Sequence, residues 1–495
     1  MEVLLLVIIS LITFVSRITN LLNVPIFTDE AIYIRWAQIG LHDPVHRYIS
    51  LTDGKQPLLT WLMYPTLSIF SDPLFAGRFV SVVASIFTVI GIYFVSRKLF
   101  GRKVAIFSAL IYIITPFSLI YDRLALMDGL LACFGIWSLY FTILLVTDLR
   151  LDHALLLGIT VGLGVLTKSS AFFFIYLLPA SLLLFNFRSK KKNNHLLRFI
   201  GLSVISIVIA QIMYNSLRLS PWFYMIRQKN YTFIYTVGEI MKAPLVHFLP
   251  NLYGLSDMLV SYLTLPIDIV VVIAFLWAVI RKDKKLLYLF AWFLFPFLSL
   301  ALFGKVLFPR FILFMALPLL IVSGFILSKL FFFALQKMKI LVLLIPLVLI
   351  YPAYQSYLAI FSPVDLAIPR TDKNQLFDDW PSGYGVNNVI SYLKEKAKYS
   401  KIIVGTEGTF GLNPAVYEMY LGNNKNVEIY GYWPVDEVPK QLLEKSTQYP
   451  TFLIFKEKQN IPTDWPLTLI GKYRRGKGDT YLFFYQVDPA KWHKV

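Results

Sequence analysis

The sequence predicts a polytopic α-helical membrane protein that ends in a small α/β domain. Of its 495 residues, 57% are hydrophobic and 15% are charged, whereas a soluble protein is nearer half apolar and about a quarter charged. Apolar runs of about 20 residues, long enough to cross a bilayer, recur from the start of the chain to about residue 360. Beyond that point the chain becomes polar, and helical and strand-like patterns alternate.

Eleven apolar runs are predicted to span the membrane. The first, near 2–22, has neither a basic start nor a small-residue cleavage site, so it is predicted to be a retained span and not a secretory signal. The segment 216–258 has room for another pair, so eleven to thirteen spans are expected. The other ten runs lie near 75–96, 103–121, 128–147, 152–168, 170–187, 196–215, 259–280, 286–304, 308–328 and 340–360.

Basic residues cluster in short loops between these runs and predict the orientation. Lysines and arginines of short loops stay on the cytoplasmic side. All the clusters share one side when the first span runs outward, which predicts a plasma-membrane protein with a cytoplasmic N-terminus. Two long loops, 23–74 and 216–258, then lie outside. The clusters are 97–103, 188–198, 281–285 and 329–339.

The same distribution explains the net charge of +18. Positive charge in loops between apolar runs serves topology, so the sequence does not predict nucleic-acid binding. The single cysteine, Cys133, lies in an apolar run and excludes a disulfide framework and a cysteine-based metal site.

Residues 362–495 are predicted to form a separate extracytoplasmic domain after a transmembrane domain of residues 1–361. The alternation of helical and strand-like patterns is typical of an α/β domain with a partly parallel sheet. Helices are expected at 386–397, 413–422 and 438–446, strands at 401–406, 427–433 and 451–456, and a closing hairpin at 467–475 and 480–487.

Asp29 and Glu30 follow the first span, at the start of a predicted helix with the sequence AIYIRWAQ. One interpretation is structural, because Thr28 or Asp29 can cap this helix and acids in the first turn suit its dipole. Adjacent side chains in a helix point about 100° apart, so the two carboxylates are not expected to act on the same group. In the functional interpretation one acid faces a cavity, and the other orients it or binds a cation.

Asp128 lies in the short outer turn YDRLALMDG. It either caps the fourth span or lines the same outer cavity as Asp29, because both turns lie on one side of the predicted topology. The structural interpretation of Asp122 and Arg123, in the same turn, is an ion pair at the surface.

Four cations map to outer turns or to outer ends of spans: Lys55, Arg123, Lys168 and Arg310. Each one alone is explained by a side chain that snorkels to the interface. Several that converge on the acids would form an anion site, most naturally for a phosphate. Arg17 lies within the first span, where a charge is costly and usually marks a functional interior.

The histidines give a weak metal signal. His42 and His46 are four residues apart but lack a third ligand. His247, in the second outer loop, is either an interfacial histidine or the partner of a metal-binding acid. The sequence has no Gly-rich phosphate loop, Ser-His-Asp order or zinc signature, so an activated donor is expected in a form other than a nucleotide.

Six short motifs follow Arg17 in a characteristic order: PIFTDEAIY, GKQPLLTWL, AGRFVS, YDRLALMD, GLGVLTKSS and PRFILFMALP. In this order the chain resembles the GT-C glycosyltransferases, and within them a prokaryotic member of the protein O-mannosyltransferase and lipid A aminoarabinose transferase (ArnT-like) type. The stretch DDWPSGYGV at 378–386 is similar to one that follows the last span in some prokaryotic members.

The resemblance implies residue roles. Members have a non-cytoplasmic active site and take a sugar from a polyprenyl phosphate. The family's Asp-Glu pair falls on Asp29 and Glu30, its aspartate at the start of the fourth span on Asp128, and its lysine before Pro-Leu on Lys55. Many members read KPPL where this chain reads KQPL, which is a departure at Gln56.

The chemistry of such a donor sets what the site has to provide. A lipid phosphate is already an adequate leaving group, so the needs are charge stabilisation at the phosphate and a base for the acceptor hydroxyl. We expect Asp29 to be that base. Glu30 or Asp128 is expected to orient it or to hold a divalent metal ion, for which His247 is a further candidate.

The cations are expected to bind the donor phosphate. Lys55, Arg123 and Arg310 are the first candidates, and Arg17, Arg78 and Lys168 are the second. The expected partners are a polyprenyl-phosphate sugar, the lipid bilayer, and an acceptor that is a protein, a lipid or a glycan. Metal dependence, the sugar and the acceptor stay open at this point.

Three other classes of membrane protein explain the sequence less well than a glycosyltransferase. A transporter or a flippase for lipid-linked glycans is expected to show inverted repeats and broken helices at the midplane, whereas here the acids lie at outer ends and no repeat is visible. A ligase or polymerase that uses diphosphate-linked glycans would share the outer cavity without needing the Asp-Glu pair. A membrane-anchored binding protein would not need eleven spans. The sequence therefore favours a membrane glycosyltransferase.

Overall fold

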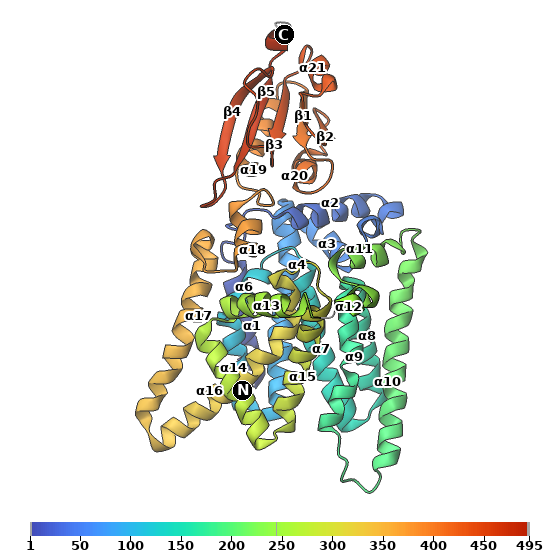
Figure 1. Ribbon diagram of the computed structural model, residues 1–495, viewed down its shortest axis with the longest axis vertical. Coiled ribbons are helices and arrows are strands. Elements are labelled where there is room, and N and C mark those ends of the chain that lie inside the picture. Colours follow the sequence, from blue (N-terminus) through green and yellow to red (C-terminus); the bar gives the residue numbers. More distant parts are fainter. Residues whose placement is uncertain (1, 244, 493–495) are drawn as a thin grey trace. The chain divides into compact units, whose positions relative to one another are not determined.

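The computed structural model describes residues 2–243 and 245–492 (Figure 1). The chain forms two compact units. The first, here called the helical unit, comprises the residues up to Leu21, Val45–Leu62 and Arg78–Pro369. The second, here called the α/β unit, comprises Leu22–Pro44, Met63–Gly77 and Arg370 onward. The predicted domain boundary after residue 361 thus corresponds to a division at Pro369, and two segments of the first outer loop belong to the α/β unit.

The helical unit consists of long apolar helices joined by short turns. Each of the eleven predicted apolar runs coincides with one or more helices. Its helices are α1 (Glu2–Ile18), α5 (Arg102–Ile114), α6 (Pro116–Tyr121), α7 (Met127–Asp148), α8 (Leu151–Thr167), α9 (Phe172–Tyr176), α10 (Lys192–Asn215), α11 (Met225–Phe233), α12 (Val237–Lys242), α13 (Phe248–Leu263), α14 (Leu265–Arg281), α15 (Lys284–Phe303), α16 (Leu313–Lys337) and α17 (Leu344–Phe361), while α3 (Leu58–Ile69) and α4 (Pro73–Phe100) begin in one unit and end in the other.

Not every predicted run is one regular spanning helix. Among the described residues, six helices are long and apolar enough to cross a membrane, or seven if the bent pair α13 and α14 is one span. Proline explains part of the difference, because it removes a helix hydrogen bond and clashes with the preceding turn. The run 103–121 is divided before Pro116, and Pro179 lies in a stretch of 3-10 helix within the run 170–187. The chain is a multi-span membrane protein.

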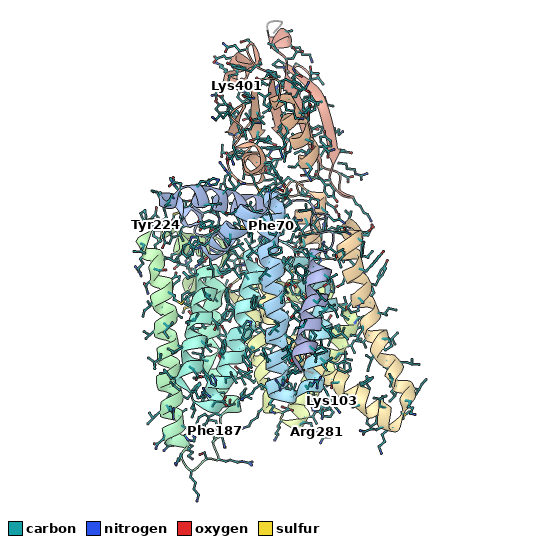
Figure 2. All side chains as sticks on the ribbon, turned by 180° about the vertical axis from the view of Figure 1, so that it is seen from behind. Phe70, Lys103, Phe187, Tyr224, Arg281 and Lys401 are labelled. Carbon is teal, nitrogen blue, oxygen red and sulfur yellow. The ribbon has the colours of Figure 1, made fainter. Side chains whose placement is uncertain are left out.

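The basic loops lie where the topology requires them. Figure 2 shows Lys103 and Arg281, from two of the four basic clusters, at the same end of the helical unit as Phe187, with Tyr224 at the opposite end. Both loops therefore face one side of a membrane. That this side is the cytoplasm stays a prediction from the charge rule.

The α/β unit contains a five-stranded sheet in the order β2-β1-β3-β5-β4. Strand β1 pairs in parallel with β2 and β3, whereas β5 runs antiparallel to β3 and β4. The predicted partly parallel sheet with a closing hairpin is confirmed. Its elements are α2 (Thr28–His42), α18 (Arg370–Lys373), α19 (Val386–Ala397), β1 (Ile402–Glu407), α20 (Leu412–Leu421), β2 (Val427–Tyr432), α21 (Lys440–Ser446), β3 (Thr451–Phe455), β4 (Leu467–Arg474), β5 (Tyr481–Val487) and α22 (Pro489–Trp492).

Helix α2 belongs to this unit although it follows the first span in the sequence. It packs against α20 (Figure 1). The segment before it forms an isolated antiparallel bridge, Phe27 with Ser382, and the Gly383 N–H donates to the Ile26 carbonyl over 2.8 Å. Arg35 pairs with Glu418 of α20 at 3.0 Å. Residues of the first outer loop are therefore an integral part of the α/β unit.

A substitution at Gly383 would test this attachment. A Cβ at this position would lie 2.7 Å from the Ile26 carbonyl oxygen and would also meet the Ile26 side chain. We expect Gly383→Ala to lower the free energy of unfolding by about 1–3 kcal/mol, the usual cost of overpacking, as measured by thermal unfolding in detergent. Gly201→Ala is the control, because its Cβ would meet no atom within 4 Å; equal destabilisation by both changes would contradict this packing.

Candidate functional site

The acid pair stands in the first turn of α2, where the two carboxylates have different surroundings. Glu30 is fully buried and accepts the backbone N–H of Phe27 over 3.0 Å, so it caps the helix. Thr28, which the structural interpretation offered as a cap, instead donates its hydroxyl to the Pro381 carbonyl over 3.0 Å. Asp29 is half-buried. Glu30 therefore caps the helix, and Asp29 is the more exposed member of the pair.

Asp128 lies in the first turn of α7 and is almost fully buried. Its carboxylate is 2.6 Å from the Lys168 Nζ, which comes from the residue just after α8. The same ammonium lies 4.3 Å from the centre of the Phe311 ring. A buried acid with such a partner is held as part of an ion pair. Two of the predicted site residues, from distant parts of the sequence, are thereby brought together.

Three of the predicted phosphate-binding cations surround one group of phenylalanine rings in the helical unit. The rings of Phe233 and Phe311 pack edge to face with centroids 5.9 Å apart. The Lys55 Nζ lies 5.2 Å from the Phe233 centroid, and the Arg310 guanidinium lies 5.8 Å from the Phe311 centroid. With Lys168 on the same Phe311 ring, this set is here called the ring-backed cation cluster. Aromatic faces attract cations through the negative face of the ring, so the two rings help to hold the three cations together.

Polar contacts fix the segment that carries Lys55. Gly54 has φ +66°, and a Cβ there would lie 2.5 Å from the Met225 carbonyl oxygen, so the turn before Lys55 packs directly on α11. The Lys229 Nζ pairs with Asp53 at 2.6 Å. Gln56 donates to the Ser169 hydroxyl over 2.6 Å. This hydrogen bond ties the residue after Lys55 to the turn that contains Lys168.

The remaining three arginines hold the end of α1. Arg17 is fully buried, pairs with Asp122 through its Nε at 3.1 Å and donates to the carbonyl of Ile113. Arg78 donates to the Leu21 carbonyl over 2.8 Å.

Arg123 donates to the carbonyls of Thr19 and Asn20 over 2.8 and 2.7 Å. Burial, and then the neighbouring Arg78 and Arg17, lower its pKa to about 9. The interpretation of Asp122 and Arg123 as a surface pair is wrong, because both are buried and Asp122 pairs with Arg17. These three arginines donate to main-chain carbonyls, and Arg17 also donates to the Asp122 carboxylate. A role for them at a phosphate stays a prediction.

The residues present do not fit a metal site. Within residues 2–243 and 245–492, no three His, Cys, Asp or Glu residues lie close enough together to hold an ion. Glu30 caps α2, and Asp128 is held by Lys168. His247 stacks on Tyr235 with centroids 4.6 Å apart and planes at 12°. No step through a metal ion is therefore proposed for this site.

The sequence did not reveal the aromatic part of the site. The cation-bearing segments were recognised, but Phe233, Phe308 and Phe311 were not. A local signal exists for two of them, because Arg310 stands between Phe308 and Phe311 in the stretch FPRF, and its guanidinium lies 4.3 Å from the Phe308 centroid. Phe233 has no such signal, since its partner rings lie in a distant segment.

Comparisons with known proteins point to one fold. The family model described as dolichyl-phosphate-mannose-protein mannosyltransferase matches residues 54–214. No curated protein sequence matches the chain significantly. The structure of ArnT from Cupriavidus metallidurans bound to undecaprenyl phosphate is 14% identical, with 98% of each chain covered and a TM-score of 0.62.

The chain has the GT-C fold. An oligosaccharyltransferase from Archaeoglobus fulgidus in the apo form is 15% identical, with 91% of this chain and 69% of that chain covered and a TM-score of 0.52. The AglB protein of the same organism, in complex with an inhibitory peptide and a dolichol-phosphate, is also 15% identical, with 91% and 68% covered and a TM-score of 0.50. The predicted resemblance to GT-C proteins is confirmed.

The buried ion pair of Arg17 and Asp122 gives a stability prediction for the helical unit. Asp122→Asn keeps the shape of the side chain but leaves the Arg17 charge without its partner. We expect the free energy of unfolding to fall by about 3–5 kcal/mol, measured by thermal unfolding of the purified protein.

The matched control is Asp152→Asn, which breaks the exposed pair with Arg150, whose side chains are 50% and 64% exposed. Such pairs contribute at most about 1 kcal/mol. Similar shifts in the two variants would mean that the Arg17–Asp122 pair is not structural.

Proposed function

We propose that the protein transfers a sugar from a polyprenyl-phosphate-linked donor to an acceptor hydroxyl on the extracytoplasmic side of the plasma membrane. The observation that carries the proposal is the ring-backed cation cluster. Lys55, Lys168 and Arg310 come from three separate segments, yet they gather around one ring pair. Excess positive charge in a membrane protein is costly unless it serves a charged ligand.

The fold supports a lipid phosphate as that ligand. The similar ArnT structure is bound to undecaprenyl phosphate, and the similar AglB complex contains a dolichol-phosphate. We assign Lys55 and Arg310 to the phosphate, while Lys168 pairs with Asp128. Arg310 offers two donors to one phosphate, and Lys55 adds a point charge.

The reaction then needs no further reactant. The acceptor oxygen attacks the anomeric carbon as its proton passes to a carboxylate. The bond from this carbon to the phosphate oxygen breaks, and its electron pair stays on the polyprenyl phosphate, where the cations stabilise the charge that develops. Asp29 is the proposed base, because Glu30 is occupied in capping α2.

Removing the phosphate cations gives the first test of this function. Lys55→Ala and Arg310→Ala are each expected to raise the KM for the donor about tenfold or more, because a hydrogen bond to a charged group is worth about 1.5–3 kcal/mol. The assay measures polyprenyl phosphate released from a panel of undecaprenyl-phosphate sugars. Lys103→Ala is the matched control, since Lys103 also lies on a ring, 3.7 Å from the Phe332 centroid. A similar rise for Lys103→Ala would argue against the assignment, and a wild-type protein that releases no polyprenyl phosphate would overturn the function.

Replacement of the base gives an independent test. Asp29→Asn is expected to lower kcat by about 10²–10⁴, the usual contribution of a general base, with little change in the KM for the donor. Asp464→Asn, an exposed acid of the same unit, is expected to leave both constants unchanged. Full activity of Asp29→Asn would remove Asp29 from the mechanism.

A further inference from the structure

A half-enclosed pocket of about 180 Å³ lies in the segment that follows α11. Its walls come from the approach to α12, from α12 itself, from the residue before α13 and from the end of α15. Tyr235, Glu239, Lys242 and His247 form its polar side, and Leu302 contributes to its apolar side. This volume equals that of about six liquid waters, which suits a single ring-sized polar group better than a lipid chain.

The pocket has a rigid aromatic wall. The rings of Tyr235 and His247 stack with centroids 4.6 Å apart and nearly parallel planes. The Lys305 ammonium lies 5.1 Å from the Tyr235 centroid and 3.0 Å from the Glu239 carboxylate. Flat rings beside hydrogen-bonding groups match a sugar, which has apolar C–H faces and hydroxyl edges.

Glu239 is held as a fixed acceptor in this pocket. The Thr236 backbone N–H donates to it over 2.6 Å, and the Thr236 hydroxyl lies 2.9 Å away. The backbone hydrogen bond, followed by that from Lys305, lowers the pKa of Glu239 to about 2. The carboxylate is therefore ionised at neutral pH, and as an acceptor without a proton it is suited to sugar hydroxyls.

The pocket is directly connected to the ring-backed cation cluster. The Phe233 carbonyl accepts the Lys305 N–H over 2.8 Å, and the Tyr235 N–H donates to the Phe303 carbonyl over 2.7 Å. Phe233 backs Lys55, whereas Tyr235, two residues further on, lines the pocket. Two residues of extended chain span at most about 7 Å, so the pocket and the ring that backs Lys55 are neighbours along the chain.

We propose that this pocket holds the sugar of the donor lipid and selects a sugar without an amino group; the inference rests on the proposed function. Lys305 is paired with Glu239, so the pocket carries the further positive charge of Lys242. With Glu239 paired to Lys305, the surroundings of the pocket have a net positive charge, which disfavours a protonated amino sugar. Neutral hydroxyls instead donate to Glu239 and accept from Lys242.

Equilibrium binding of three lipids to the full-length protein in detergent tests this assignment. The probes are undecaprenyl phosphate, undecaprenyl-phosphate mannose and undecaprenyl-phosphate 4-amino-4-deoxyarabinose, with affinities measured by thermophoresis. The mannose lipid is expected to bind about tenfold more tightly than undecaprenyl phosphate, a gain equivalent to one or two net hydrogen bonds. The amino-sugar lipid is expected to show no such gain.

Variants of the pocket separate sugar binding from phosphate binding. Tyr235→Ala and His247→Ala are expected to reduce the affinity for the mannose lipid to that for undecaprenyl phosphate and to leave the latter unchanged. Tyr235→Phe keeps the ring and is expected to keep most of the gain. Lys242→Gln is expected to narrow the difference between the two sugars. The control is Tyr253→Ala, which changes an exposed tyrosine of α13 outside the pocket.

The outcomes distinguish the two proposals. A wild-type protein that binds undecaprenyl phosphate without any gain from mannose, or that prefers the amino sugar, overturns the pocket assignment and leaves the proposed function intact. Tyr235→Ala with an undiminished gain, or with equally weakened binding of all three lipids, also overturns it. A wild-type protein that binds none of the lipids overturns both proposals.

Discussion

A guanidinium or ammonium that is buried away from water needs hydrogen-bond or charge partners for its donors. The cations of the helical unit meet this need in two different ways. Three buried arginines contact the polar groups near the end of α1. Arg17 pairs with Asp122, and Arg78 and Arg123 donate to main-chain carbonyls. Lys55 and Arg310 lie against aromatic rings. The same residue types are therefore placed against the main chain at one end of α1 and against rings elsewhere in the unit.

Local patterns were sufficient to predict most of the secondary structure. Helix α19 matches the predicted range 386–397, because its apolar residues recur with helical spacing. The strands β1 and β3 were recognisable as short apolar runs between polar turns. The membership of α2 in the α/β unit was not predictable, since it depends on the bridge between Phe27 and Ser382, which lie far apart in the sequence.

The candidate site also has a part that local sequence predicts and a part that depends on tertiary packing. Charged residues are rare in apolar sequence, so Asp29, Asp128 and the cations were found from position alone. Their partners were not, because the pairing of Lys168 with Asp128 and the rings beneath the cations result from tertiary packing. The helix-capping role of Glu30 was not visible in the sequence either, because Thr28 and Asp29 were equally good candidates for the cap. The choice of Asp29 as the base stays a prediction.

The ring-backed cation cluster is suited to a reaction in which charge accumulates on the phosphate. A polyprenyl-phosphate sugar is a diester with one negative charge, whereas a phosphate monoester carries about −1.5 to −2 near neutral pH. Cations that contact this phosphate bind it more strongly as it gains the charge of the product than they bind it in the donor. Only an interaction that is stronger in the transition state than in the bound substrate accelerates a reaction. The same difference slows release of the lipid product. The aromatic rings behind Lys55 and Arg310 add no negative charge of their own, whereas Lys168 is paired with the Asp128 carboxylate.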